Sequence, residues 1–147
     1  MNNKDFTMSF LVEQSPREVF EAVNNVQGWW IDQIEGESHK LNDEFSVQFA
    51  DIHYSRQKLV EFVPDSKVVW LITDSRLSFL TDKEEWTGSK IVFEISKQDS
   101  KTKFQFTHEG LVPDIECYSS CSNAWSDFIT KSLFKLITTG AGEPFHK

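Results

Sequence analysis

The stretch FTHEGLVPDIECYSSCSNAW, residues 106–125, gathers the side chains of this sequence that are best suited to chemistry. His108 is followed by Glu109, and Cys117 and Cys121 lie four residues apart. An imidazole with an ordinary pKa of about 6.5 could serve as a general acid or base near neutral pH. A cysteine thiolate could attack a substrate with that imidazole as its base, and cysteine and histidine together could bind zinc.

The strand pattern around His108 argues against a simple His-Glu pair. In TKFQFTHE, residues 102–109, the side chains of Phe104, Phe106 and His108 share one face of the strand. Glu109 lies on the other face, because successive residues of a strand alternate. Two interpretations of His108 remain. It is either a half-buried histidine bonded to a backbone carbonyl or water, or a polar group that orients a ligand in a pocket.

The two cysteines lie on one side of a predicted helix. Together with His108 they would supply three zinc ligands where a structural site needs four, at a spacing typical of no common zinc motif. A Cys121 nucleophile with His108 as its base lacks a third, orienting group in the sequence. There is also no glycine-rich phosphate loop, GxSxG or HExxH motif. We therefore predict no catalytic residue, no metal and no cofactor.

Period-two patterns predict the strands that must position these side chains. They cover residues 5–13, 43–50, 53–63, 67–74, 76–81, 88–96 and 102–109. Short polar turns between them indicate an antiparallel meander. After the first strand, SPREVFEAV predicts a helix from Pro16, with Ser15 and Glu18 as a capping box. The next residues, VQGWWI, are interpreted as a further helical turn with Trp29 and Trp30 packed under the sheet.

The last predicted element is a long helix over residues 114–139, with Pro113 at its start and Gly140 after its end. Its apolar stripe comprises Tyr118, Cys121, Trp125, Ile129, Ser132 and Leu136. Phe134 falls on the opposite side and has no explanation from the pattern. A helix about 10 Å wide cannot fill the concave face of a broad sheet. Either aromatic side chains fill the remaining space or a cavity remains there.

Composition restricts the function further. The chain has 147 residues, a formal charge of −8, 13 Phe and 5 Trp, and we expect one domain over residues 1–147. The acidic balance argues against nucleic acid as a partner. No apolar run approaches the ~20 residues that span a bilayer, and the start lacks a signal-peptide pattern. We expect a cytoplasmic protein with reduced thiols and no membrane insertion.

Four phrases together resemble the START-like (SRPBCC) superfamily: SPREVFEAVNNVQGWW, KLVEFVPDSKVVWLITDS, EWTGSKIVFEIS and the opening FTHEGLVPDIECYSSCSNAW. The branch they resemble is the bacterial family similar to the activator of the heat-shock-protein-ninety ATPase. The resemblance implies an α+β helix-grip fold. In it a curved antiparallel sheet of six to seven strands wraps around a long C-terminal helix, with one or two short helices after the first strand. Members include lipid and hormone binders, polyketide cyclases and a co-chaperone.

We therefore predict that the chain binds a small hydrophobic or aromatic molecule, lipid-like or polyketide-like, between sheet and helix, without catalysis. A cyclase- or hydrolase-type enzyme that uses His108, and a module that acts with a chaperone, are the alternatives. His53 is predicted to serve turn structure beside Asp51. LSFL, residues 77–80, is interpreted as an apolar lip at a pocket mouth or part of a solvated turn. The predicted ligand-binding residues are Trp30, Phe49, Trp70, Phe93, Phe106, His108, Cys121 and Trp125.

Overall fold

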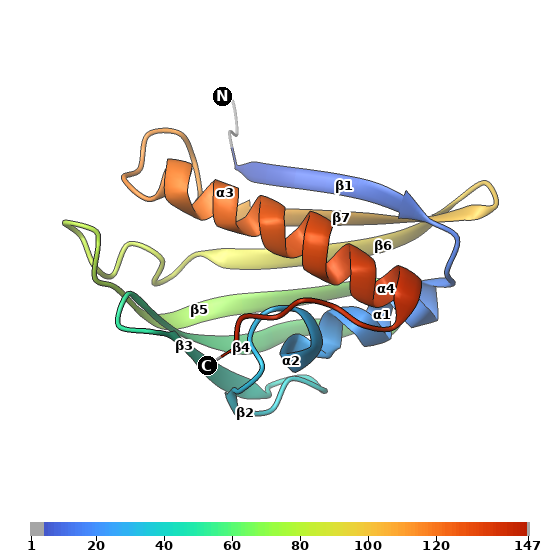
Figure 1. Cartoon of the computed structure of the whole chain (residues 1–147), viewed down its shortest axis with the longest axis horizontal. Coiled ribbons are helices and arrows are strands. Elements are labelled where there is room, and N and C mark those ends of the chain that lie inside the picture. The colour runs from blue at the N-terminus through green and yellow to red at the C-terminus, as the bar shows by residue number, and fades with distance from the viewer. Residues whose placement is uncertain (1–4, 147) are drawn as a thin grey trace.

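A computed structural model describes residues 5–146 and contains a seven-stranded sheet (Figure 1). Every neighbouring pair of strands is antiparallel, and the order across the sheet is β1-β7-β6-β5-β4-β3-β2. Only β1 leaves the meander order, because it pairs with β7. The strands are β1 (Phe6–Val12), β2 (Glu35–Gly36), β3 (Glu44–Phe49), β4 (His53–Val63), β5 (Lys67–Leu77), β6 (Lys90–Gln98) and β7 (Lys101–Glu109).

The helices lie on one face of this sheet. A long continuous helix crosses in front of the strands, and two short helices lie on the same side near its C-terminal end (Figure 1). The helical segments are α1 (Pro16–Asn24), α2 (Val26–Trp29), α3 (Tyr118–Asp127), η1 (Phe128–Leu133) and α4 (Phe134–Thr139). This is the predicted α+β helix-grip fold. Among residues 5–146, no helix is both long and apolar enough to cross a membrane.

The covered face of the sheet carries large aromatic side chains. The alternation along β7 buries Phe104, Phe106 and His108, and it leaves Glu109 exposed, as predicted. Facing residues of β5 and β6, notably Trp70 and Phe93, are also fully buried. Each such ring contributes roughly 1.5–3 kcal/mol by leaving water. The core therefore lies between the sheet and the helices, where the sequence pattern predicted it.

The predicted strands agree with the structure except around residues 76–81. β5 continues to Leu77, and the following residues turn back instead of forming a separate strand. Leu77 N donates to Lys83 O, and Leu80 N donates to Leu77 O, which closes a compact loop. The short strand β2 was not predicted, because two residues carry no periodic signal. The loop between β5 and β6 matters below because it contributes to the candidate site.

The first helix begins as its capping box predicts. Glu18 N donates to Ser15 Oγ at 3.2 Å, and Ser15 N donates to Glu18 Oε1 at 2.9 Å. α2 then holds Trp29 and Trp30 beneath the sheet, both buried. The predicted packing of these two indoles is confirmed.

The long helix begins at Tyr118, so the predicted start at residue 114 is wrong. Turns precede it, and the backbone N–H groups of Glu116 and Cys117 donate to the carboxylate of Glu85 at 3.2 and 3.0 Å. These amides would otherwise be unpaired at a helix start. A carboxylate from the β5–β6 loop therefore satisfies them, which a local sequence pattern cannot reveal.

The same helix contains a π-helical segment, η1, that the stripe did not predict. A π-helix bonds residues five apart, so it rotates the following residues relative to an α-helix. Phe134, unexplained by the stripe, consequently lies over the sheet edge, where its ring meets Phe10 at 5.1 Å between centroids. Leu133 and Ile137 also turn inward. The apolar face of the helix thus changes phase at η1.

The segment after α4 folds back along α2. Phe145 forms a parallel bridge with Ile31, donating to Trp30 O while Asp32 N donates to Phe145 O, both at 2.9 Å. Gly142 permits the close approach, because a Cβ there would lie 2.4 Å from Gly28 O. This return path places the Phe145 ring beside the cavity described next.

Candidate functional site

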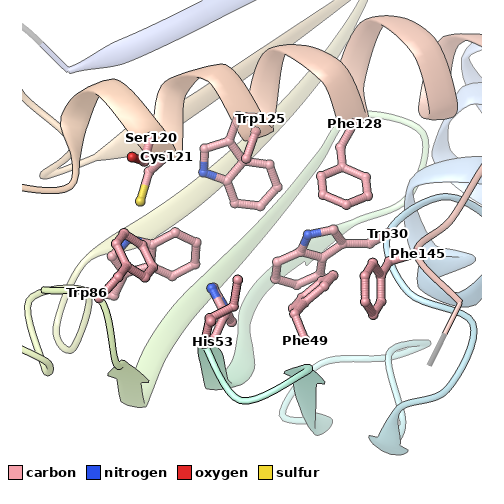
Figure 2. Close-up of a pocket in the computed structure, with 12 residues that line it drawn as sticks. Trp30, Phe49, His53, Trp86, Ser120, Cys121, Trp125, Phe128 and Phe145 are labelled. Carbon is pink, nitrogen blue, oxygen red and sulfur yellow. The ribbon is translucent and has the colours of Figure 1, made fainter.

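A cavity of about 300 Å³ opens between the long helix and the end of the sheet (Figure 2). Its walls come from six regions: α2, the β3–β4 corner, the β5–β6 loop, α3, η1 and the returning C-terminal segment. The volume is at the lower end for ligand pockets. The lining residues are Trp30, Phe49, Ile52, His53, Phe79, Trp86, Ser120, Cys121, Ala124, Trp125, Phe128 and Phe145.

The lining is almost entirely apolar. Among the described residues that form it, none is Lys, Arg, Asp or Glu, and the nitrogen-bearing side chains are three indoles and one imidazole. Indoles supply large rigid surfaces with a single N–H donor each. The cavity therefore suits an uncharged ligand with extensive apolar surface.

His53, at the start of β4, is the one titratable side chain on the cavity wall that the structure describes. It rises between Trp86 on one side and Phe49 and Trp30 on the other (Figure 2). All three rings meet the imidazole nearly at right angles, with Trp86 nearest at 4.6 Å between centroids. Desolvation by these apolar neighbours lowers the pKa of His53 to about 3. The imidazole is therefore neutral at physiological pH.

A polar row continues from His53 along the inner face of β4. Gln57 Nε2 donates to Ser55 Oγ, and Ser55 Oγ lies 2.9 Å from His53 Nε2. Ser55 and Gln57 are fully buried. The other ring nitrogen, Nδ1, has no hydrogen-bond partner among the described residues. One nitrogen of His53 is thus held by the protein, while the other is available.

His108 lies deeper and uses both of its nitrogens. Trp125 Nε1 donates to His108 Nδ1 at 3.1 Å, so Nδ1 must be unprotonated and the proton lies on Nε2. Nε2 then donates to Ser89 Oγ at 2.9 Å, and Ser89 Oγ donates to Trp86 O at 2.6 Å. Burial is the main cause that lowers the pKa of His108 to about 3. The ring is a neutral, fully bonded connector between sheet, loop and helix.

Cys117 and Cys121 form a disulfide, so the expectation of reduced thiols is wrong for this structure. Their separation of four residues places the Cα atoms 5.5 Å apart. Cys121 lies on the cavity wall, whereas Cys117 is fully buried behind it. Within residues 5–146, no three His, Cys, Asp or Glu side chains gather in a group that could hold a metal ion.

The structure separates the eight residues predicted to bind ligand into two layers. Trp30, Phe49, Cys121 and Trp125 line the cavity. The other four, Trp70, Phe93, Phe106 and His108, are fully or almost fully buried and do not line it. They support the lining from behind.

Ring contacts join the two layers. Trp70 stacks on Trp30 at 5.5 Å, and Phe106 contacts Trp125 at 4.7 Å between ring centroids. Face alternation identified these inward-facing residues correctly, but it could not show which of them the helix covers.

Eight lining residues were not among those predicted to bind ligand. His53 was predicted to serve turn structure, yet its ring lies on the cavity wall. The alternative of an apolar lip at LSFL agrees with Phe79, which is half exposed at the cavity. In the sequence, Phe79 was marked by its place in an apolar run directly before the charged residues 81–86. No comparable local signal marks Phe145, because only its return along α2 brings it to the cavity.

Comparison with known proteins finds similarity at the level of structure. No family model matches the sequence, and no curated protein matches it. Among solved structures, the Aha1 dimer from Colwellia psychrerythraea matches with a TM-score of 0.76 at 19% identity, over 94% of this chain and 98% of that chain. That likeness extends over almost the whole of both chains.

Two further solved structures match more than nine-tenths of this chain. DynU16, a protein in the dynemicin biosynthetic locus, matches with a TM-score of 0.65 at 14% identity, over 96% of this chain and 49% of that one, so this chain spans about half of its length. CalU16 from Micromonospora echinospora matches with a TM-score of 0.65 at 11% identity, over 92% and 77%. These likenesses show a shared fold. The chain has the helix-grip fold that the sequence resemblance implied.

Proposed function

We propose that this START-like domain binds a small, uncharged, largely apolar molecule between its sheet and its long helix, without transforming it. The observation that carries the proposal is the cavity itself, with aromatic walls from six regions and no charged lining residue among those described. A void of this size leaves its aromatic lining without packing partners, which a bound apolar ligand would supply. Apolar burial would supply most of the affinity.

The environment of His108 supports binding over catalysis. A general acid or base needs a nitrogen within hydrogen-bond reach of the substrate. Both nitrogens of His108 are already bonded, to Trp125 and Ser89, and the ring does not line the cavity. Proton transfer through His108 would require those bonds to break, so we do not assign it a chemical role. The likeness to the Aha1 structure, at 19% identity, concerns the fold alone and supports no partner.

The proposal is tested by a substitution that places a larger side chain in the cavity from an exposed position on α3. Ala124 lines it from α3, whereas its neighbour Asn123 is exposed and does not line it. Ala124→Leu should weaken binding of isopropenylnaphthalene at least about tenfold by occupying the space that the ring needs. Asn123→Leu, the matched control, should bind as the unchanged protein does. Calorimetric titration measures both, and equal affinity in the two variants would contradict this site.

A further inference from the structure

The three cavity-lining indoles have nearly parallel planes. Trp86 lies 12° from the plane of Trp125, and Trp30 lies 27° from it, with centroids 5.9 and 5.2 Å away. Offset stacking between parallel rings is a preferred aromatic geometry. A flat ring that lies against this row of indoles can stack on it, while a branched or saturated molecule would leave gaps against the rings.

The charge of the surroundings excludes an anionic ligand. The described lining residues include no Lys or Arg, and the neutral His53 cannot act as a cation. Removing a carboxylate from water without a partner strongly weakens its binding. The chain as a whole has a formal charge of −8, which disfavours anions further. Fatty acids and other carboxylates are therefore poor candidates.

The hydrogen bonds of the β4 row determine what His53 offers to the cavity. Ser55 Oγ accepts a hydrogen bond from Gln57 Nε2, and its own proton remains to be placed. With the Gln57 amide turned so that Nε2 faces Ser55, His53 Nε2, 2.9 Å away, is the acceptor available to the Ser55 hydroxyl among the described residues. Because buried hydroxyl groups are normally satisfied, Ser55 donates to Nε2. His53 then carries its proton on Nδ1, and this N–H has no acceptor within residues 5–146.

We infer that the ligand is an uncharged, flat aromatic molecule with a carbonyl oxygen that accepts a hydrogen bond from Nδ1 of His53. The inference rests on the proposed binding function. It adds the requirement for a planar ring and for one acceptor, placed at the β4 end of the cavity. The indoles provide the stacking surface, and the Gln57–Ser55 row provides the direction of the imidazole. One hydrogen bond in an apolar site favours such a ligand by roughly 5- to 10-fold.

Three probes of nearly equal shape test this inference in the unchanged protein. Acetylnaphthalene has the carbonyl oxygen, isopropenylnaphthalene replaces that oxygen by a methylene group, and naphthoate carries a carboxylate. We expect the ketone to bind about 5- to 10-fold more tightly than the alkene, and naphthoate to bind most weakly. Equal affinity of ketone and alkene, or tightest binding of naphthoate, would overturn the inference while leaving the binding function standing. Failure of all three to bind would overturn the binding function as well.

Two variants assign the preference to His53. His53→Phe keeps the ring and removes the donor, so the ketone and the alkene should bind it equally. Ser55→Ala keeps His53 but removes the hydroxyl that fixes its proton on Nδ1. The preference for the ketone over the alkene should therefore fall in this variant too. In the unchanged protein, heteronuclear NMR of the imidazole should show Nε2 unprotonated and Nδ1 protonated. The reverse tautomer, or a ketone preference that persists in His53→Phe, would contradict the assignment.

Discussion

Two histidines of this protein touch the same indole but have different hydrogen-bond environments. Trp86 lies 4.6 Å from His53 and 4.9 Å from His108, with both rings nearly perpendicular to it. Burial lowers the pKa of both imidazoles to about 3. His108 has a partner at each nitrogen, whereas His53 has a partner at Nε2 and none at Nδ1 in the part of the chain that the structure describes.

The difference shows that burial and pKa do not by themselves mark a functional histidine. Both rings are equally neutral, so electrostatics does not separate them. The two rings differ in their hydrogen-bond partners. The hydrogen bonds of His108 stabilise the packing of the helix against the sheet, whereas Nδ1 of His53 is available to a ligand. Each prediction below tests one side of this contrast.

The largest expected effect is that of pH on stability. Each histidine is protonated with a pKa of about 6.5 when unfolded and of about 3 when folded. The unfolded state therefore binds more protons between these values, and stability falls as pH falls through this window. From pH 7 to 5 we expect a loss of about 2 kcal/mol from His108 and up to about 2 kcal/mol from His53, whose open side is partly screened.

Urea unfolding at the two pH values measures this loss. The variant His53→Phe should retain only the part that belongs to His108. Stability that does not change between pH 7 and 5 would mean that neither histidine is desolvated as described.

Substitution of the two histidines by phenylalanine should separate them next. His108→Phe removes two hydrogen bonds and leaves the buried Trp125 N–H unpaired, so it should lower the free energy of unfolding by about 2–4 kcal/mol. His53→Phe leaves the buried Ser55 hydroxyl without its acceptor but gains apolar contact, and it should cost about 1–2 kcal/mol. Chemical denaturation at pH 7 checks both. Equal losses of unfolding free energy in the two variants would contradict the assignment of His108 as a structural residue and His53 as a cavity residue.

Ser89 and Ser55, the serine partners of the two histidines, allow a comparison with smaller expected effects. Each is replaced by alanine, and both stability and ligand preference are measured. Ser89→Ala removes the acceptor of His108 and the donor to Trp86 O, which should cost about 1–2 kcal/mol. It should leave the preference for acetylnaphthalene over isopropenylnaphthalene unchanged, whereas Ser55→Ala should reduce that preference. Denaturation and calorimetry on the same two variants provide the measurements. A loss of preference in Ser89→Ala would show that the two networks are coupled.

The smallest effect is expected for the indole that the histidines share. Trp86 Nε1 is buried without a hydrogen-bond partner among the described residues, so Trp86→Phe loses no hydrogen bond. The variant should cost about 1 kcal/mol, mainly through lost stacking on Trp125. Thermal unfolding tests this expectation. A cost above about 3 kcal/mol would imply a bond to Nε1 that the contrast between the histidines does not include.

Much of the fold could be predicted because its signals are local. Alternation along β7 placed Phe106 and His108 inward and Glu109 outward, and the capping box located the start of α1. The long helix was predicted with the wrong start, because Glu85 from a distant loop satisfies its first amides. Four of the twelve lining residues, among them Trp30 and Trp125, were predicted from the sequence. The remainder depended on chain paths that periodicity does not encode.

The sequence by itself determined the faces of the strands, the antiparallel order of β3 to β7 and the amphipathic character of the last helix, since each depends on residues close in the chain. Only the tertiary structure decided which histidine meets the cavity. His53, Trp86 and Phe145 reach it from three distant segments, and Trp125 shields His108 by bonding to it. The disulfide and the phase change at η1 were also decided there. A pocket is defined by what surrounds it, and that is a property of the folded chain.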